Sequence, residues 1–121
     1  MCIEAYAAGM IDGDGSIQIQ RISIGRFRLV VYLSGCNPAP LDELQSHWGG
    51  GITETTLRTG RQYFRWGLTS TRAANFLEEI LPYLRGKFDQ ATLALKFQHD
   101  GHNAESGNTM KQTMSALSRK G

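Results

Sequence analysis

The strictest constraint on the fold of this chain is the alternation of apolar and other side chains in residues 26–34, RFRLVVYLS. The apolar residues of one parity are Phe27, Leu29, Val31 and Leu33. Successive side chains of a β-strand point to opposite faces of the sheet, so this pattern predicts a strand with one face in the core. Residues 15–22, GSIQIQRI, alternate in the same way. Gly25 lies between the two segments, which predicts a β-hairpin.

A second hairpin is expected from residues 52–58 and 61–69, joined through Thr59-Gly60. In its last strand Phe64, Trp66 and Leu68 are expected to face the core. Tyr63 and Arg65 then face outward, because they have the opposite parity. The facing of residues 52–58 stays open, because threonines occupy both parities.

Helical patterns surround these hairpins. Helices are expected at residues 2–12, at 41–48 with proline near the start, at about 71–84, and at 88–97. Ser70 or Thr71 is expected to cap the third helix, and Leu93 and Phe97 to share one face of the last. Gly13 or Gly15 is expected to end the first helix in a left-handed conformation.

The resulting element order, α-β-β-α-β-β-α-α, predicts an α+β fold with one antiparallel sheet and helices on one face. The 121 residues suffice for a single domain, 1–121, with its core in about 2–98. Residues 100–110 are expected to form a loop, and 111–119 a short C-terminal helix.

Composition excludes several classes of protein. No apolar run approaches the ~20 residues that cross a bilayer, and the first residues lack the basic segment of a secretory signal. An intracellular location is therefore expected, in the cytoplasm or in an organelle such as a chloroplast or mitochondrion. Cys2 and Cys36 are expected to be free thiols. His99 and His102 have a loose H-x-x-H spacing, but without another plausible ligand nearby they are interpreted as surface residues.

The charge is unevenly distributed, although the net charge is only +2. Residues 16–72 contain seven arginines, three acidic residues and no lysine. The guanidinium fork suits phosphate groups and guanine edges, which favours a nucleic-acid partner. The alternative is a sheet face that is simply exposed to solvent.

Residues 7–15, AAGMIDGDG, resemble the nine-residue motif of the LAGLIDADG homing endonucleases. Ala7 and Met10 depart from the motif, and Gly13 replaces its alanine. The resemblance extends to the αββαββα order over residues 2 to about 98. It also includes 81–91, LPYLRGKFDQA, which resembles a late family segment carrying a basic lysine, here Lys87.

The resemblance implies a saddle-like four-stranded sheet and a homodimer, because the chain has one motif and the family fold pairs two motif helices. The residues expected at the dimer interface share one helix face and are Ala5, Ala8, Gly9 and Asp12. Pairing brings the two Asp14 carboxylates together, which requires a cation between them. Mg²⁺, with Mn²⁺ as a substitute, is expected on Asp14 and the Gly13 carbonyl. Lys87 is expected to stabilise the pentacoordinate phosphate or to orient the water during double-strand cleavage that leaves 3′ overhangs.

DNA recognition is assigned to the outward face of the sheet, which fits the major groove. The residues expected to contact DNA are Ser16, Gln18, Gln20, Arg26, Arg28, Tyr32, Ser34, Arg58, Arg61, Tyr63 and Arg65. Among them Arg58, at a hairpin tip, is expected to hold phosphate. Dimer symmetry implies a long pseudo-palindromic target. No small-molecule cofactor and no membrane partner are expected.

Other functions remain open at this stage. A cleavage-inactive relative on the same fold, acting as an intron RNA maturase or a transcription regulator, would keep the nucleic-acid surface without cutting. A small interaction domain with an accidental motif is a further alternative, as is one half of a larger two-motif protein.

Overall fold

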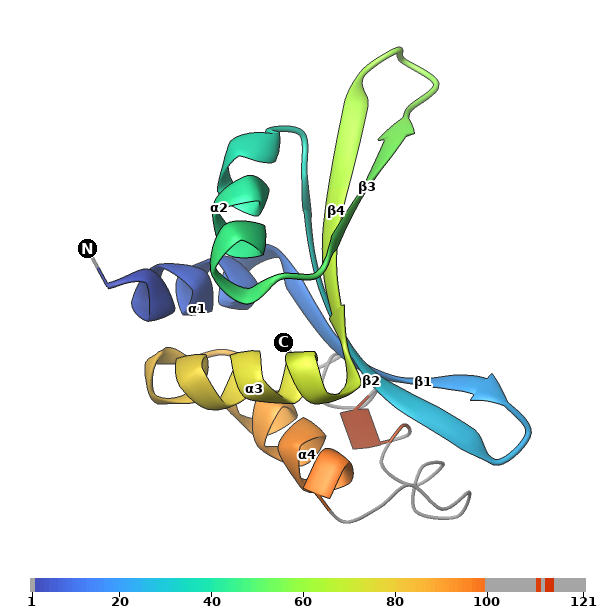
Figure 1. The fold of residues 1–121 in the computed structure, drawn as a ribbon, viewed down its shortest axis with the longest axis vertical. Helices are drawn as coiled ribbons and strands as arrows, with labels where there is room; N and C mark the ends of the chain where they lie inside the picture. Colours follow the sequence, from blue (N-terminus) through green and yellow to red (C-terminus); the bar gives the residue numbers. More distant parts are fainter. Residues whose placement is uncertain (1, 100–110, 112, 115–121) are drawn as a thin grey trace.

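The structure is a computed structural model that describes residues 2–99, 111, 113 and 114. The helices are α1 (Ile3–Asp14), α2 (Pro38–Trp48), α3 (Ser70–Ile80) and α4 (Phe88–His99), with a 3₁₀ turn, η1 (Leu81–Tyr83) (Figure 1). The strands are β1 (Gly15–Ser23), β2 (Arg26–Gly35), β3 (Gly51–Thr56) and β4 (Gln62–Thr69). The predicted α+β class and the order of elements are confirmed.

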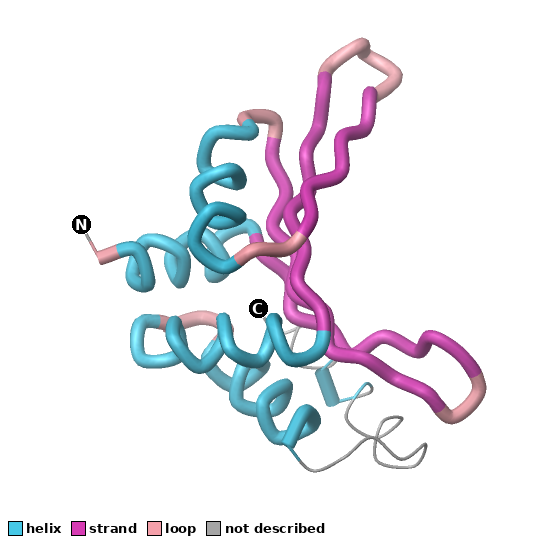
Figure 2. Tube along the Cα trace, viewed as in Figure 1, coloured by secondary structure: helices cyan, strands magenta, loops and turns pink. Residues whose placement is uncertain are grey.

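The four strands form one antiparallel sheet in the order β1-β2-β4-β3. Each hairpin turns at a glycine with a left-handed backbone, Gly25 (φ 73°) and Gly60 (φ 86°), as the sequence indicates. The outer ends of the two hairpins diverge from the centre of the sheet, and the helices lie on one side of it (Figure 2). None of the helices that the structure describes covers the opposite side of the sheet.

The core lies between the sheet and the helices. The inward parity of β2 is buried as predicted, and Trp66 and Leu68 of β4 are buried beside it. Val30, expected to face outward, is fully buried and does not belong to the core cluster. It lies on an inner strand opposite Gln18 and Thr69, so side chains of both neighbouring strands flank it on the outward face.

The facing of β3, left open by the sequence, follows from its pairing with β4. Ile52 lies opposite Trp66 and therefore shares the core face. Thr53 lies opposite Arg65 and Thr55 opposite Tyr63, so both threonines belong to the outward face. The sheet consequently presents a polar surface from β3 that the sequence did not assign.

Two details of the helices differ from expectation. The cap of α3 is Thr69 rather than Ser70 or Thr71, because β4 passes directly into the helix and Ser70 makes the turn with φ 51°. On α4 the buried residues are Gln90, Ala91, Ala94 and Phe97, whereas Leu93 is only partly buried.

Part of the C-terminal prediction lies outside the described residues, including the loop 100–110 and His102. Residues 111, 113 and 114 are helical. Among the residues that the structure describes, no helix combines the length and apolar composition needed to cross a membrane.

Candidate active site and nucleic-acid interface

The acidic motif lies where α1 passes into β1 without an intervening loop. Gly15 has extended backbone angles (φ −83°, ψ 170°), and neither Gly13 nor Gly15 adopts a left-handed conformation, so that prediction is wrong. Glycine is required at position 15 for a different reason, because a side chain there would collide with Ile11. A Cβ there would lie 2.7 Å from the Ile11 Cα and 2.9 Å from the Ile11 carbonyl oxygen.

Asp12 fastens the end of α1 to the segment before α4. Its Oδ2 accepts a hydrogen bond from the Arg85 main-chain N–H at 2.8 Å, and its Oδ1 accepts one from the Lys87 N–H at 2.9 Å. The Lys87 ammonium donates to the Asp12 carbonyl oxygen at 2.9 Å. The Asp12 carboxylate, which was expected at a dimer interface, therefore forms its hydrogen bonds within its own chain.

Lys87 borders a hollow of about 430 Å³ beside the motif. The lining residues are Asp12, Gly13, Gly15, Ser16, Ile17, Gly86, Lys87 and Gln90. An ammonium group has three N–H donors, and the Asp12 carbonyl takes one of them. The structure thus brings the predicted Lys87 next to Gly13, with donor capacity remaining on its ammonium.

Asp14 is exposed at the end of α1, and within the described part of the chain its carboxylate has no hydrogen bond or ion pair. Gly13 is also exposed, and a Cβ there would have no atom within 4 Å. Main-chain carbonyls in the last turn of a helix lack intrahelical donors. Two oxygen atoms that can act as metal ligands are therefore accessible at the end of α1. One belongs to the charged Asp14 carboxylate and the other to the neutral Gly13 carbonyl.

The surface of α1 differs from the interface that the sequence predicted. Ala8 is fully buried in the core of its own chain and has no surface to offer a partner, so its assignment to an interface is wrong. Ala5 and Gly9 are exposed, and Gly13 continues the same face one turn later. A Cβ at Gly9 would meet no atom within 4 Å. The open stripe of α1, defined as Ala5, Gly9 and Gly13, is the surface that a second backbone can approach.

A hydrogen-bonded row crosses the outward face of β1 and β2. The Gln18 amide donates to Ser16 Oγ at 2.8 Å, and the Gln20 amide donates to Gln18 Oε1 at 3.3 Å. The Gln20 amide also lies 3.1 Å from the Tyr32 hydroxyl. The four predicted polar residues thus form one connected group.

Arg65 is held in a defined position on this face. Its guanidinium carbon lies 4.7 Å from the centre of the Tyr32 ring, and its Nε donates to Ser34 Oγ at 3.2 Å. The stacking and the Nε bond leave the Nη donors directed elsewhere. Tyr32 and Arg65 line a hollow of about 450 Å³ with Tyr63, Thr53 and Thr55. The sequence did not predict that Thr53 and Thr55 lie on this face, because only the register between β3 and β4 determines which way they point.

The remaining predicted arginines are exposed. Arg26 and Arg28 lie on β2, where they border a separate hollow with Ile22 and Gln98. Arg58 and Arg61 lie in the β3–β4 turn, which a hydrogen bond from the Leu57 N–H to the Arg61 carbonyl closes at 2.8 Å. The cationic side chains are thus spread between the sheet face and the tips of both hairpins.

Comparison by sequence with family models and with curated proteins finds no match. Comparison of structures does. The homing endonuclease I-CvuI, solved in complex with its target, superposes with a TM-score of 0.79 at 22% identity, over 95% of this chain and 81% of that chain. The I-SmaMI LAGLIDADG homing endonuclease, bound to cleaved DNA, matches with a TM-score of 0.63 at 17% identity. The chain has the LAGLIDADG homing endonuclease fold.

A third structure supports the same assignment of fold. The archaeal intron-encoded homing endonuclease I-Vdi141I, complexed with DNA, has a TM-score of 0.73 at 20% identity, over 98% of this chain and 86% of that chain. The I-SmaMI match covers 94% of this chain but only 42% of that chain. The likeness to the LAGLIDADG fold that the motif indicated is confirmed, while the roles of individual site residues remain predictions.

Proposed function

We propose that this chain is a site-specific DNA endonuclease that acts as a homodimer and uses a divalent metal ion. The observation that carries the proposal is the exposed Asp14 carboxylate at the end of the motif helix, which has no partner among the described residues, in a fold shared with endonucleases solved on DNA. A binding protein would have no need for an uncompensated carboxylate at a surface that meets phosphate, because like charges repel.

The donors at the end of α1 fit Mg²⁺, and they fit Mn²⁺ as a substitute. Both Asp14 and the Gly13 carbonyl offer oxygen, the ligand type that Mg²⁺ prefers, and Mg²⁺ retains several waters. The missing side chain at Gly13 leaves room for a phosphate to approach. When bound, the ion stabilises charge on the attacking and leaving oxygens of the phosphodiester. I-CvuI has been solved with its target in the presence of Ca²⁺ and, with DNA that was not cleaved, in the presence of Mg²⁺.

The open stripe of α1 supports dimerisation through this helix. Glycine at two of its three positions lets two helix backbones come close. An interface around a two-fold axis uses the same patch on both chains, so a dimer through α1 brings two copies of Asp14 toward one another. Each copy then serves one strand of the duplex, which predicts a pseudo-palindromic target. The resemblance to the LAGLIDADG homing endonucleases further implies staggered cuts with 3′ overhangs.

Lys87 and the sheet supply the other functions of the chain. The Lys87 ammonium is anchored on the Asp12 carbonyl, and we assign its remaining N–H donors to a phosphate oxygen whose charge grows during cleavage. The outward face of the sheet reads base edges, with the Arg65 guanidinium suited to guanine and the glutamine row suited to adenine. Arg58, at the hairpin tip, holds phosphate. We place the protein inside the cell, in the cytoplasm or an organelle, where duplex DNA is available.

A selection from random duplex DNA tests the proposal and identifies the target sequence in the same experiment. Duplexes retained by the protein in Ca²⁺ are sequenced, and the enriched duplex is then incubated with Mg²⁺ or Mn²⁺. We expect wild-type protein to cut both strands and Asp14→Asn to bind the same duplex without cutting it. Retention of a specific duplex with no cleavage in either ion would favour the binding-only alternative. Retention of no duplex at all would contradict DNA recognition itself.

A further inference from the structure

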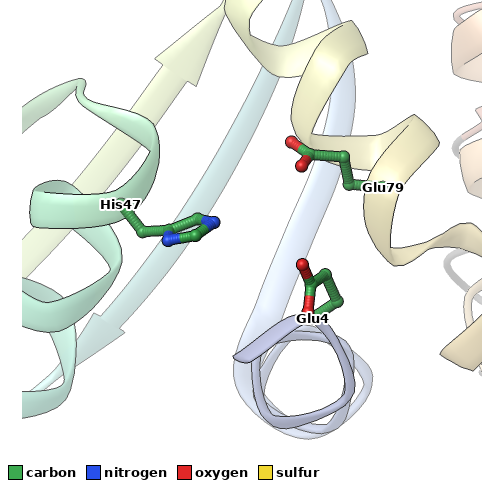
Figure 3. Close-up of side chains that lie close together, drawn as sticks. All are labelled: Glu4, His47 and Glu79. Carbon is green, nitrogen blue, oxygen red and sulfur yellow. The ribbon is translucent and has the colours of Figure 1, made fainter. Parts of the chain in front are cut away.

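A second group of metal-ligating side chains lies away from the end of α1. Glu4 of α1, His47 of α2 and Glu79 of α3 point toward a common space between their helices (Figure 3). One ligand atom from each residue lies within 4.8 Å of the others. Glu4 is in the first turn of α1, whereas Asp14 is its last residue, so nearly the whole length of the helix separates the two sites.

The charges of this group call for a cation. Two carboxylates face one another across a few ångströms, and like charges at this separation repel. Among the described residues neither Glu4 nor Glu79 forms an ion pair within 4.0 Å. His47 is the third member of the group, and its imidazole offers a nitrogen ligand.

Neighbouring contacts hold two of the side chains in place. The Trp48 indole N–H donates to Glu79 Oε2 at 2.7 Å, which leaves Oε1 available as a ligand. The Cys2 thiol lies 3.4 Å from Glu4 Oε2. Each carboxylate thus has a hydrogen-bond partner on one oxygen and keeps its other oxygen for a ligand position.

We propose that Glu4, His47 and Glu79 bind one divalent cation of the zinc class and thereby cross-link α1, α2 and α3. One imidazole and two carboxylates suit Zn²⁺ better than Mg²⁺, which prefers oxygen ligands throughout. Zinc bonds of about 2.0–2.2 Å require ligand atoms about 3.3 Å apart. The ligand atoms now lie within 4.8 Å of one another, and rotation of the long Glu4 and Glu79 side chains can shorten these distances to the required value. This inference is independent of the proposed nuclease function.

Calorimetric titration of the whole chain with Zn²⁺ measures the affinity and the stoichiometry of the proposed site. We expect one equivalent to bind, and we expect His47→Gln and Glu79→Gln each to lower the affinity by tenfold or more. Trp48→Phe, which removes the hydrogen bond to Glu79, is expected to lower affinity by about 10–100-fold. Because Zn²⁺ would bind only the folded chain, it is also expected to raise the unfolding midpoint of wild-type protein and not of His47→Gln.

The chain offers a matched control in a second histidine–glutamate pair. His99 Nε2 lies 3.1 Å from Glu78 Oε1, and the described residues provide no third ligand for this pair. His99→Gln is expected to leave Zn²⁺ affinity unchanged, as is Asp14→Asn, which separates this site from the proposed catalytic one. Cys2→Ser is expected to retain binding, which distinguishes the cluster from capture by the thiol. Absence of saturable Zn²⁺ binding, or equal affinity in wild type and His47→Gln, would overturn the inference.

Discussion

Asp12 and Lys87 are joined twice, once through the Asp12 carboxylate and once through its main-chain carbonyl, with both hydrogen bonds at 2.9 Å. Asp12 also holds the Arg85 N–H. The acidic motif is therefore a structural joint as well as a candidate catalytic element. Of its two acids, Asp12 fixes the chain to itself, whereas Asp14 is presented to the outside.

We expect Asp12→Ala to lower the free energy of unfolding by about 1–3 kcal/mol, because two main-chain N–H groups lose their acceptor. Urea denaturation followed by circular dichroism measures this change. The matched variant is Asp14→Ala, two residues further along the same helix, because the exposed Asp14 side chain makes no such bond to any residue that the structure describes. It should unfold at nearly the wild-type urea concentration. Similar losses in the two variants would contradict the assigned roles.

The glycines of the motif give a second prediction. Gly15→Ala places a Cβ against the backbone of Ile11, so we expect a loss of about 1–3 kcal/mol in the free energy of unfolding. Gly13→Ala meets open space within the helix and is expected to raise that free energy by up to about 1 kcal/mol. Thermal denaturation of the two variants should therefore shift in opposite directions. A destabilised Gly13→Ala chain would indicate a packing role that the structure does not show.

Sequence reasoning succeeded for features that depend on local periodicity. The inward residues of β2 were predicted because a two-residue alternation is visible within nine residues. Val30 is buried although its parity is outward, and it is flanked on that face by residues of β1 and β4. Strand order is a property of the whole sheet, so no local pattern contains it.

The candidate site shows the same limit. Residues 7–15 indicated Asp14 and Gly13, and the late segment indicated Lys87, through resemblance to a known family. The joint between Asp12 and Lys87 was not predicted, because it connects residues 75 positions apart. The burial of Ala8 was missed for a related reason. A stripe of small residues fits both the chain's own core and a partner, and only packing decides between them.

A bulky residue on the open stripe of α1 tests the proposed dimer. At Gly9 a Cβ would meet no packed atom of the described residues within 4 Å, so we expect Gly9→Leu to fold. The larger side chain keeps two α1 helices apart, and sedimentation should then give the mass of a monomer where wild type gives a dimer. Thr92→Leu, an exposed change on α4, serves as the control and should remain dimeric. A dimeric Gly9→Leu protein would place the interface elsewhere.

Arg65 and Arg58 are expected to affect DNA binding in different ways. Arg65→Lys loses the bidentate fork and the contact with Ser34, so we expect a penalty of about 1–3 kcal/mol against guanine at one position of each half-site. Arg58→Ala, at the exposed β3–β4 turn, should weaken binding to all sequences and reduce the salt slope by about one per chain. Competition binding with single-base variants of the selected duplex, repeated at several salt concentrations, separates the two effects. If Arg65→Lys weakened every sequence equally, Arg65 would be a phosphate contact and the assignment of base reading to the Tyr32–Arg65 hollow would be wrong.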